Sequence, residues 1–169
     1  FDYNANIMVL RNPFNQLASL FIDAQRAGVG RMWPPPDTYT SMWKSYAKEF
    51  LGETPYLQSQ QENNTLKVCV SYDDWFTDED YRKQISKKLT LDFSDEGLEY
   101  VNGFGEGSSF DDQKYIYNAQ KMKVLERWKQ LDEYPKWTEI FNKLLADDEL
   151  TSYAKEIFHD HTTEILEKR

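Results

Sequence analysis

The stretch IMVLRNPFNQLASLF, residues 7–21, predicts a strand that passes directly into a helix. Its first four residues are apolar, which is typical of a short strand buried on both faces of a parallel sheet. Asn12 has a side-chain oxygen that can cap a helix. Pro13 suits the first helical position, where no N–H is needed. The apolar positions that follow fall on one helical face, namely Phe14, Leu17, Ala18, Phe21 and Ala24.

The polar side of this helix predicts an anion site. In open parallel sheets, ligands bind beyond the carboxyl ends of the strands, where a helix N-terminus presents free N–H groups and a partial positive charge. Arg11 stands at that point, and its guanidinium fork suits a phosphate group. Ser19 adds a hydroxyl on the polar line of the same helix. Taken alone, the residues leave a second interpretation open, in which Arg11 caps a surface loop and Ser19 is an ordinary exposed serine.

Length, charge and cysteine content restrict the classes of protein. A chain of 169 residues is expected to form one domain, residues 1–169. The net charge of −9 argues against nucleic acid or an anionic membrane as a partner. No signal peptide or membrane-spanning run is found, so we expect a cytoplasmic protein. Cys69 is the single cysteine, which excludes an internal disulfide, and its V-C-V context indicates a small core residue.

Arg11-Asn12-Pro13, with Ser19 eight positions after the arginine, resembles a motif of sulfotransferases. In that family a strand, an Arg-Asn/Asp-Pro turn and a helix serine bind the 3′-phosphate of the donor 3′-phosphoadenosine 5′-phosphosulfate. The resemblance implies that Arg11 and Ser19 hold this phosphate.

A second strand is predicted where apolar residues alternate with polar ones, over residues 66–72. The sequence YDDWF, residues 72–76, follows it. Thr77 and Asp80 then form a capping box for a helix that reaches about residue 89. This order is similar to the Tyr-Glu-Asp-Leu strand end and Leu-Gly-Leu turn of sulfotransferases, with Asp73, Trp75 and Thr90 in place of three family residues. Asp73 and Asp74 are interpreted as structural acids rather than as a metal site or a general base.

A helix rich in aromatic residues is predicted between these two strands. Asp37 is expected to cap it, and Gly52 stands where a left-handed residue would end it. One face carries an apolar stripe, for which core packing is favoured over an acceptor pocket. The stripe consists of Tyr39, Met42, Trp43, Tyr46, Ala47 and Phe50.

The sequence GFGEGSSF, residues 103–110, predicts a loop whose backbone can approach a ligand closely. It is not a Walker A loop, because G-x-x-x-x-G-K-[ST] occurs nowhere in the chain. It resembles the late Ser-Ser loop with which some sulfotransferases close over the nucleotide or the sulfuryl group. The resemblance implies nucleotide contacts for Ser108, Ser109 and Phe110, with either serine near the sulfuryl end. A helix over residues 118–131 is expected next, and Lys114 and Lys121 are expected to be solvated.

The last part of the sequence predicts helices. One covers residues 136–145, and another begins at residues 147–149. His159 and His161 are the only histidines, and without a third ligand they are interpreted as exposed residues near a helix end, so no metal is expected.

The order of these landmarks predicts an α/β fold, a P-loop NTPase-like parallel sheet flanked by helices, helix-rich and incomplete at its N-terminus. The resemblance implies sulfuryl transfer from 3′-phosphoadenosine 5′-phosphosulfate, a co-substrate bound without metal, to a hydroxyl or amine acceptor. The family's 5′-phosphosulfate loop, P-K/R-S-G-T, and its upstream His or Glu base are absent from this sequence. We therefore expect no turnover by this chain alone. The alternatives are a non-catalytic helical interaction module, an inactive relative, or a fragment of a nucleotide kinase.

Overall fold

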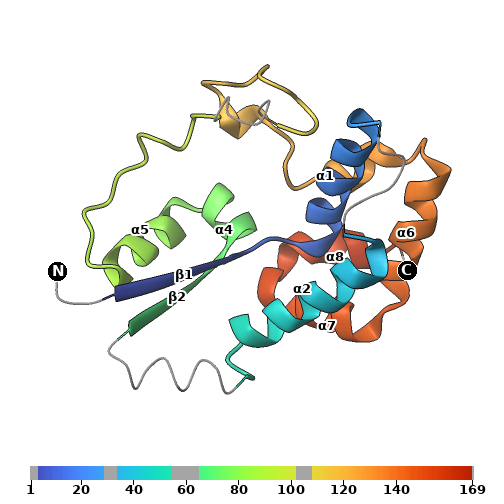
Figure 1. Ribbon diagram of the computed structural model, residues 1–169. Coiled ribbons are helices and arrows are strands. Elements are labelled where there is room, and N and C mark those ends of the chain that lie inside the picture. The colour runs from blue at the N-terminus through green and yellow to red at the C-terminus, as the bar shows by residue number, and fades with distance from the viewer. Residues whose placement is uncertain (1–3, 29–33, 55–64, 102–107, 169) are drawn as a thin grey trace.

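The computed structural model describes residues 4–28, 34–54, 65–101 and 108–168. Over these residues the chain is helix-rich and contains a two-stranded parallel sheet (Figure 1). The sheet lies at one end of the molecule, and most of the helices gather at the other. The predicted α/β character is therefore confirmed, with a much smaller sheet than the prediction implied.

The two predicted strands pair in parallel. β1 (Asn4–Leu10) and β2 (Thr65–Ser71) are in register from Asn4 opposite Thr65 to Leu10 opposite Ser71. Because the strands are parallel, their carboxyl ends meet at one edge of the sheet. Arg11 and Tyr72, the residues that follow the two strands, therefore lie at the same edge.

The prediction that β1 is buried on both faces is wrong. Ile7 is 54% exposed and Val9 is 59% exposed, whereas Leu10 at the end of the strand is buried. An apolar run shows only that its side chains are suited to burial. A strand is buried on both faces only when another layer of structure covers each face of the sheet. Val9 borders a cavity together with Met42 and Tyr46, and Ile7 borders one with Tyr46, but these neighbours do not bury either side chain.

α1 (Pro13–Arg26) begins as predicted, because the Asn12 side chain accepts a hydrogen bond from the Phe14 N–H and Pro13 is the first helical residue. α2 (Pro36–Phe50) begins differently. Its cap is Pro35, without a side-chain hydrogen bond, and Asp37 lies exposed in the first turn. The prediction that Asp37 caps this helix is wrong, since Pro36 already supplies the first helical residue.

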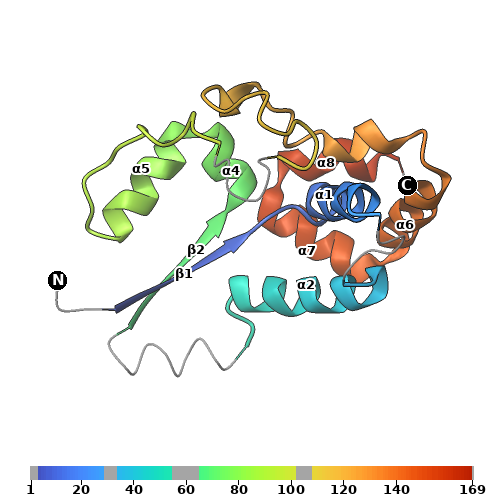
Figure 2. The same ribbon diagram turned by 45° about the horizontal axis from the view of Figure 1, so that its top comes forward.

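The main core lies between helices. α1 and α2 pack with η2 (Arg127–Leu131), α6 (Pro135–Ala146), α7 (Asp148–Phe158) and α8 (Asp160–Leu166), as both views show (Figures 1 and 2). The predicted apolar face of α1 is buried there, and Trp43 and Trp137 are among the largest fully buried side chains. Asp147 caps α7 by accepting a hydrogen bond from the Leu150 N–H. The predicted start of that helix is confirmed.

A smaller core joins β2 to α4 (Tyr72–Thr77) and α5 (Glu79–Lys88), where Val68, Val70 and Ile85 are buried. The predicted capping box at Thr77 is not formed. Thr77 is the last residue of α4, and Asp78 caps α5 by accepting hydrogen bonds from the N–H groups of the second and third residues after it.

The helix expected over residues 118–131 is also wrong. Two short 3₁₀ helices, η1 (Ala119–Lys121) and η2, occupy this region, separated by irregular chain. The side chain of Asn15 provides the physical reason. It donates to the Leu125 carbonyl and accepts from the N–H groups of Arg127 and Trp128. An α-helix would need these main-chain groups for its own hydrogen bonds.

None of the described helices combines the length and the apolar character that crossing a lipid bilayer requires.

Candidate anion site

Arg11 is placed by contacts on both sides of its backbone. The Arg11 carbonyl accepts a hydrogen bond from the indole N–H of Trp43 at 3.0 Å. The N–H of Asn12 donates to the Asp73 carboxylate at 3.3 Å. These contacts fix the end of β1 to α2 and to the start of α4, so rigid elements set the direction of the Arg11 side chain.

The structure brings Arg11 and Ser19 together. Nη1 of Arg11 lies 3.3 Å from the hydroxyl oxygen of Ser19, and Nη2 donates to the carbonyl of Val124 at 2.9 Å. Ser19 itself is 9% exposed and donates to the carbonyl of Asn15, one turn earlier in α1. The arginine also lies over the ring of Tyr72, with 5.1 Å from its guanidinium carbon to the ring centre. Both of the residues that the motif indicated therefore face one point.

A second arginine, Arg127, meets them there, and sequence reasoning missed it. It is buried at the start of η2, and its Nη1 lies 3.3 Å from the same Ser19 oxygen. It also donates to the hydroxyls of Ser109, at 2.9 Å, and Ser108, at 2.8 Å. Ser108 and Ser109, the two serines predicted as ligand contacts, therefore lie at this site, where their uncharged hydroxyls accept hydrogen bonds from the buried guanidinium of Arg127.

The positive charge of this cluster is only partly balanced. Among the described residues, Arg127 forms one long ion pair, with Asp111 at 3.7 Å, and Arg11 forms none. Burial and the neighbouring Arg11 together lower the pKa of Arg127 to about 10, so it remains protonated at neutral pH. Two cations that share one hydroxyl repel each other in a medium of reduced dielectric constant. A bound anion would remove this repulsion.

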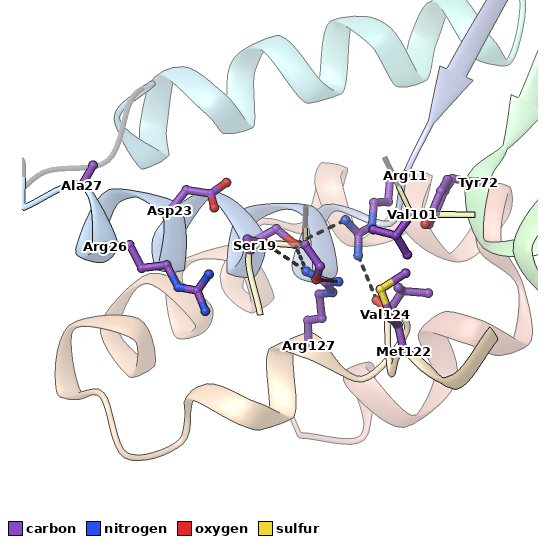
Figure 3. A pocket seen from close by; sticks show the side chains of 12 residues that line it. Arg11, Ser19, Asp23, Arg26, Ala27, Tyr72, Val101, Met122, Val124 and Arg127 are labelled. Atoms are coloured by element: carbon purple, nitrogen blue, oxygen red, sulfur yellow. Dashed lines mark hydrogen bonds between the residues drawn. The ribbon is translucent and has the colours of Figure 1, made fainter. Parts of the chain in front are cut away.

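The two arginines lie in the wall of a cavity of about 740 Å³ (Figure 3). Its volume lies in the range of small-molecule and cofactor sites, about 300–1,000 Å³. The cavity lies along α1, and the residue after β2, the turn at residues 108–109 and the segment after η1 also line it. The other described residues in its wall are Ser19, Asp23, Arg26, Ala27, Tyr72, Val101, Ser108, Ser109, Met122 and Val124.

The remaining predicted ligand contacts lie elsewhere. The ring of Phe110 packs against Arg127, 4.8 Å from the guanidinium carbon, and borders a different cavity. Phe110 therefore supports the arginine instead of lining the site. Lys114 and Lys121 are exposed, as expected. Residues 103–107 of the predicted glycine loop lie outside the described residues.

Arg26 contributes to the edge of the same cavity. Its guanidinium forms an ion pair with the carboxylate of Asp112. The main chain of Asp112 in turn forms an antiparallel bridge with Ser108. This contact ties the end of α1 to the turn that carries Ser108 and Ser109.

Asp73 has the structural role that was predicted. It is fully buried, and one of its oxygens accepts from Asn12 while the other has no partner among the described residues. Burial raises the pKa of Asp73 to about 6. Its neighbour Asp74 lies 3.4 Å from Nε2 of His161, and that contact raises the pKa of the imidazole.

His161 is thus half-buried and paired, which corrects the prediction of an exposed helix-end residue. Across the described ranges, no group of three or more His, Cys, Asp or Glu side chains is arranged to hold a metal ion.

The aromatic stripe of α2 is divided between two roles. Tyr39, Trp43 and Ala47 are buried in the core, as expected. Met42 and Tyr46 remain 44% and 47% exposed and border a second cavity of about 390 Å³. Arg11 and Tyr72 line both cavities, so their stacked side chains lie between the two.

The arrangement is suited to holding an anion. The groups that meet at Ser19 are guanidinium N–H donors and hydroxyls. The cavity wall also carries one carboxylate, Asp23, and no histidine among its described residues. One signal in the sequence could have indicated Arg127, namely a basic residue directly before Trp128 in a stretch with apolar residues at helical spacing. Comparison with protein-family models, with curated proteins and with solved structures found no match.

Proposed function

We propose that this chain is sulfotransferase-like and that its cavity binds 3′-phosphoadenosine 5′-phosphosulfate through the 3′-phosphate. The observation that carries the proposal is the convergence of Arg11 and Arg127 on the hydroxyl of Ser19, at the carboxyl end of a parallel strand. The reaction would transfer the sulfuryl group to a hydroxyl or amine acceptor.

A phosphate monoester matches the charge and the donors of this site. It carries between one and two negative charges at neutral pH and offers three acceptor oxygens. Two guanidinium groups can donate to different oxygens of one such group, and hydrogen bonds of this charge-assisted kind are strong. Ser108 and Ser109, which already contact Arg127, would lie beside the same phosphate.

The choice of this particular nucleotide rests on the order of the motifs. Arg11-Asn12-Pro13 with Ser19, the Tyr72-Asp73-Asp74 strand end and the Ser-Ser turn follow one another as they do in sulfotransferases. A P-loop NTPase-like sheet remains the proposed wider fold. Because the sequence holds no P-K/R-S-G-T loop, the function proposed for these 169 residues is donor binding, and turnover is not expected from them alone.

Isothermal titration calorimetry with adenosine 3′,5′-bisphosphate tests the proposal. A hydrogen bond to a charged group contributes about 1.5–3 kcal/mol, so Arg127→Ala is expected to weaken binding by at least about tenfold. Arg11→Ala should have a similar effect. Adenosine 5′-monophosphate, which lacks the 3′-phosphate, should bind weakly to all three proteins.

Lys143→Ala is the matched control, because it removes one exposed positive charge far from the cavity wall. It should leave binding unchanged. Equal affinity of the two nucleotides for the unmodified chain would contradict the proposal, and so would unchanged binding by both arginine variants.

A non-catalytic interaction module is the second candidate function. The observation that favours it is the exposed apolar side of β1, where Ile7 and Val9 are more than half exposed. Absence of any nucleotide binding, together with a well-folded chain by circular dichroism, would leave this candidate as the better one.

A further inference from the structure

Asp23 brings a negative charge to the cavity that holds Arg11 and Arg127. It lies four residues after Ser19, on the same side of α1, and lines the same cavity (Figure 3). It is the one acid among the described residues of the cavity wall. Arg26, the nearest basic residue along the helix, forms its ion pair with Asp112 instead. Among the described residues, no group forms a hydrogen bond or ion pair with the Asp23 carboxylate; only its main-chain carbonyl accepts one, from the N–H of Ala27.

A carboxylate in this position is unfavourable for a free anion. It repels phosphate or sulfate and reduces the attraction that the arginines provide. Partial burial raises the pKa of Asp23, although Arg26 and Arg127 oppose this effect. The carboxylate is exposed to the solvent of the cavity and has no donor among the described residues. A ligand that brings a hydroxyl or amino group there would supply one.

The distance along α1 from Ser19 to Asp23 fits a ligand that has a phosphate at one end and a hydrogen-bond donor at the other. Four residues of an α-helix span about 6 Å along its axis. A phosphate between Arg11 and Arg127 thus leaves its ester substituent within reach of Asp23. Nucleosides carry sugar hydroxyls and exocyclic amino groups at such distances from their phosphate.

We infer that Asp23 accepts a hydrogen bond from a sugar hydroxyl or base amino group of the bound ligand, so that the cavity selects nucleoside phosphates over free anions. This inference rests on the proposed function, since it takes the phosphate position from the two arginines. It assigns Asp23 as a specificity-determining residue that the motif does not include.

The test uses the sign of the change in affinity. Calorimetry would compare the unmodified chain with Asp23→Ala, using adenosine 3′,5′-bisphosphate and inorganic phosphate as separate ligands. The variant should bind the nucleotide about tenfold more weakly, the loss typical of one hydrogen bond to a charged group. It should bind inorganic phosphate more tightly, by twofold or more, because a repelling charge has been removed. Asp23→Asn keeps an acceptor oxygen and should lose less nucleotide affinity than Asp23→Ala.

Glu156→Ala is the control, because it makes the same change in net charge at an exposed position on α7. It should alter neither affinity. If Asp23→Ala strengthens or leaves unchanged the binding of both ligands, the inference is overturned while the proposed function stands. If the unmodified chain binds inorganic phosphate but not the nucleotide, or binds neither, the proposed function fails as well.

Discussion

Two buried ionisable side chains, Arg127 and Asp73, show at the scale of single residues how burial acts on opposite charges. Burial disfavours the charged form of each, so it lowers the pKa of Arg127 to about 10 and raises that of Asp73 to about 6. The arginine nevertheless stays charged at neutral pH. The pKa of Asp73, in contrast, lies where folded protein can be studied. The pH dependence of stability can therefore be used to measure how burial acts on this carboxyl group.

We predict that Asp73 makes stability fall as pH rises from about 4 to about 6. Its pKa is 3.8 when unperturbed and about 6 in the folded chain. The folded state therefore binds the proton more tightly, and above pH 6 the charged carboxylate destabilises it by up to about 3 kcal/mol. Relative to the unmodified chain, Asp73→Asn should gain stability over this range in urea unfolding.

The comparison must separate Asp73 from the pair beside it. Asp74 and His161 titrate in both proteins, and the Asp73 charge also helps to raise the pKa of His161. The same two unfolding profiles are therefore compared again in a His161→Gln background, which removes the imidazole. A difference between Asp73→Asn and the unmodified chain that stays constant with pH would show that burial does not perturb this carboxyl group.

Residues of the site differ in how far they could be predicted. Arg11, Asn12 and Ser19 lie within nine positions of one another, and local helix geometry alone sets their spacing. Arg127 reaches Ser19 across 108 positions. That contact depends on how the chain folds between them, which no local pattern encodes.

At the scale of secondary-structure elements, the region of residues 118–131 shows why a helical pattern can fail. Ala119, Met122 and Leu125 have helical spacing. Asn15 nevertheless takes the main-chain groups of residues 125, 127 and 128, and only short 3₁₀ helices form. A single buried amide thus overrides the weak preference of the sequence. The same amide sets the position of Arg127.

The end of α5 allows a direct test of backbone strain. Thr90 has φ +54°, and the N–H groups of Thr90 and Leu91 donate to the carbonyls of Lys87 and Ser86. These are the two hydrogen bonds of a Schellman motif, which favours glycine at the position of Thr90. Thr90→Gly should stabilise the chain by about 1 kcal/mol, because a left-handed β-branched residue is strained. Urea unfolding would measure the change.

Gly52 offers the opposite substitution. It has φ +78° at the end of α2, where the same pair of hydrogen bonds forms. Gly52→Ala should destabilise the chain by about 1–2 kcal/mol. Two substitutions with the same sign would show that left-handed geometry does not determine these helix ends.

At the scale of the whole molecule, the sheet marks the limit of what the sequence could predict. Residues 7–10 lie in a parallel strand, as predicted, and so does the run predicted over residues 66–72 except for Tyr72, which begins α4. These strands could be predicted because their apolar patterns are local. The exposure of Ile7 and Val9 depends instead on whether another layer covers β1. That is a property of the assembled chain, and apolar composition alone suggested the opposite.

The cavity draws its walls from parts of the chain that are far apart: the end of β1, α1, the start of α4, the turn at residues 108–109, and η2. A ligand held by Arg11 and Arg127 would therefore stabilise the whole fold against unfolding. At one hundred times its dissociation constant, such a ligand contributes about 2.7 kcal/mol. For a domain of this size that corresponds to a rise in Tm of roughly 5–10 °C.

Differential scanning fluorimetry with adenosine 3′,5′-bisphosphate would measure this rise. Hydrogen exchange on the same samples should show slower exchange at the N–H groups of Arg127 and Trp128, which Asn15 holds. At the same ligand concentration, a loss of affinity of about tenfold in Arg127→Ala should reduce the stabilisation to about 1.4 kcal/mol, so the rise in Tm should fall by half or more. Lys143→Ala should preserve the full rise. An undiminished rise in Tm for Arg127→Ala would mean that the nucleotide does not contact this guanidinium.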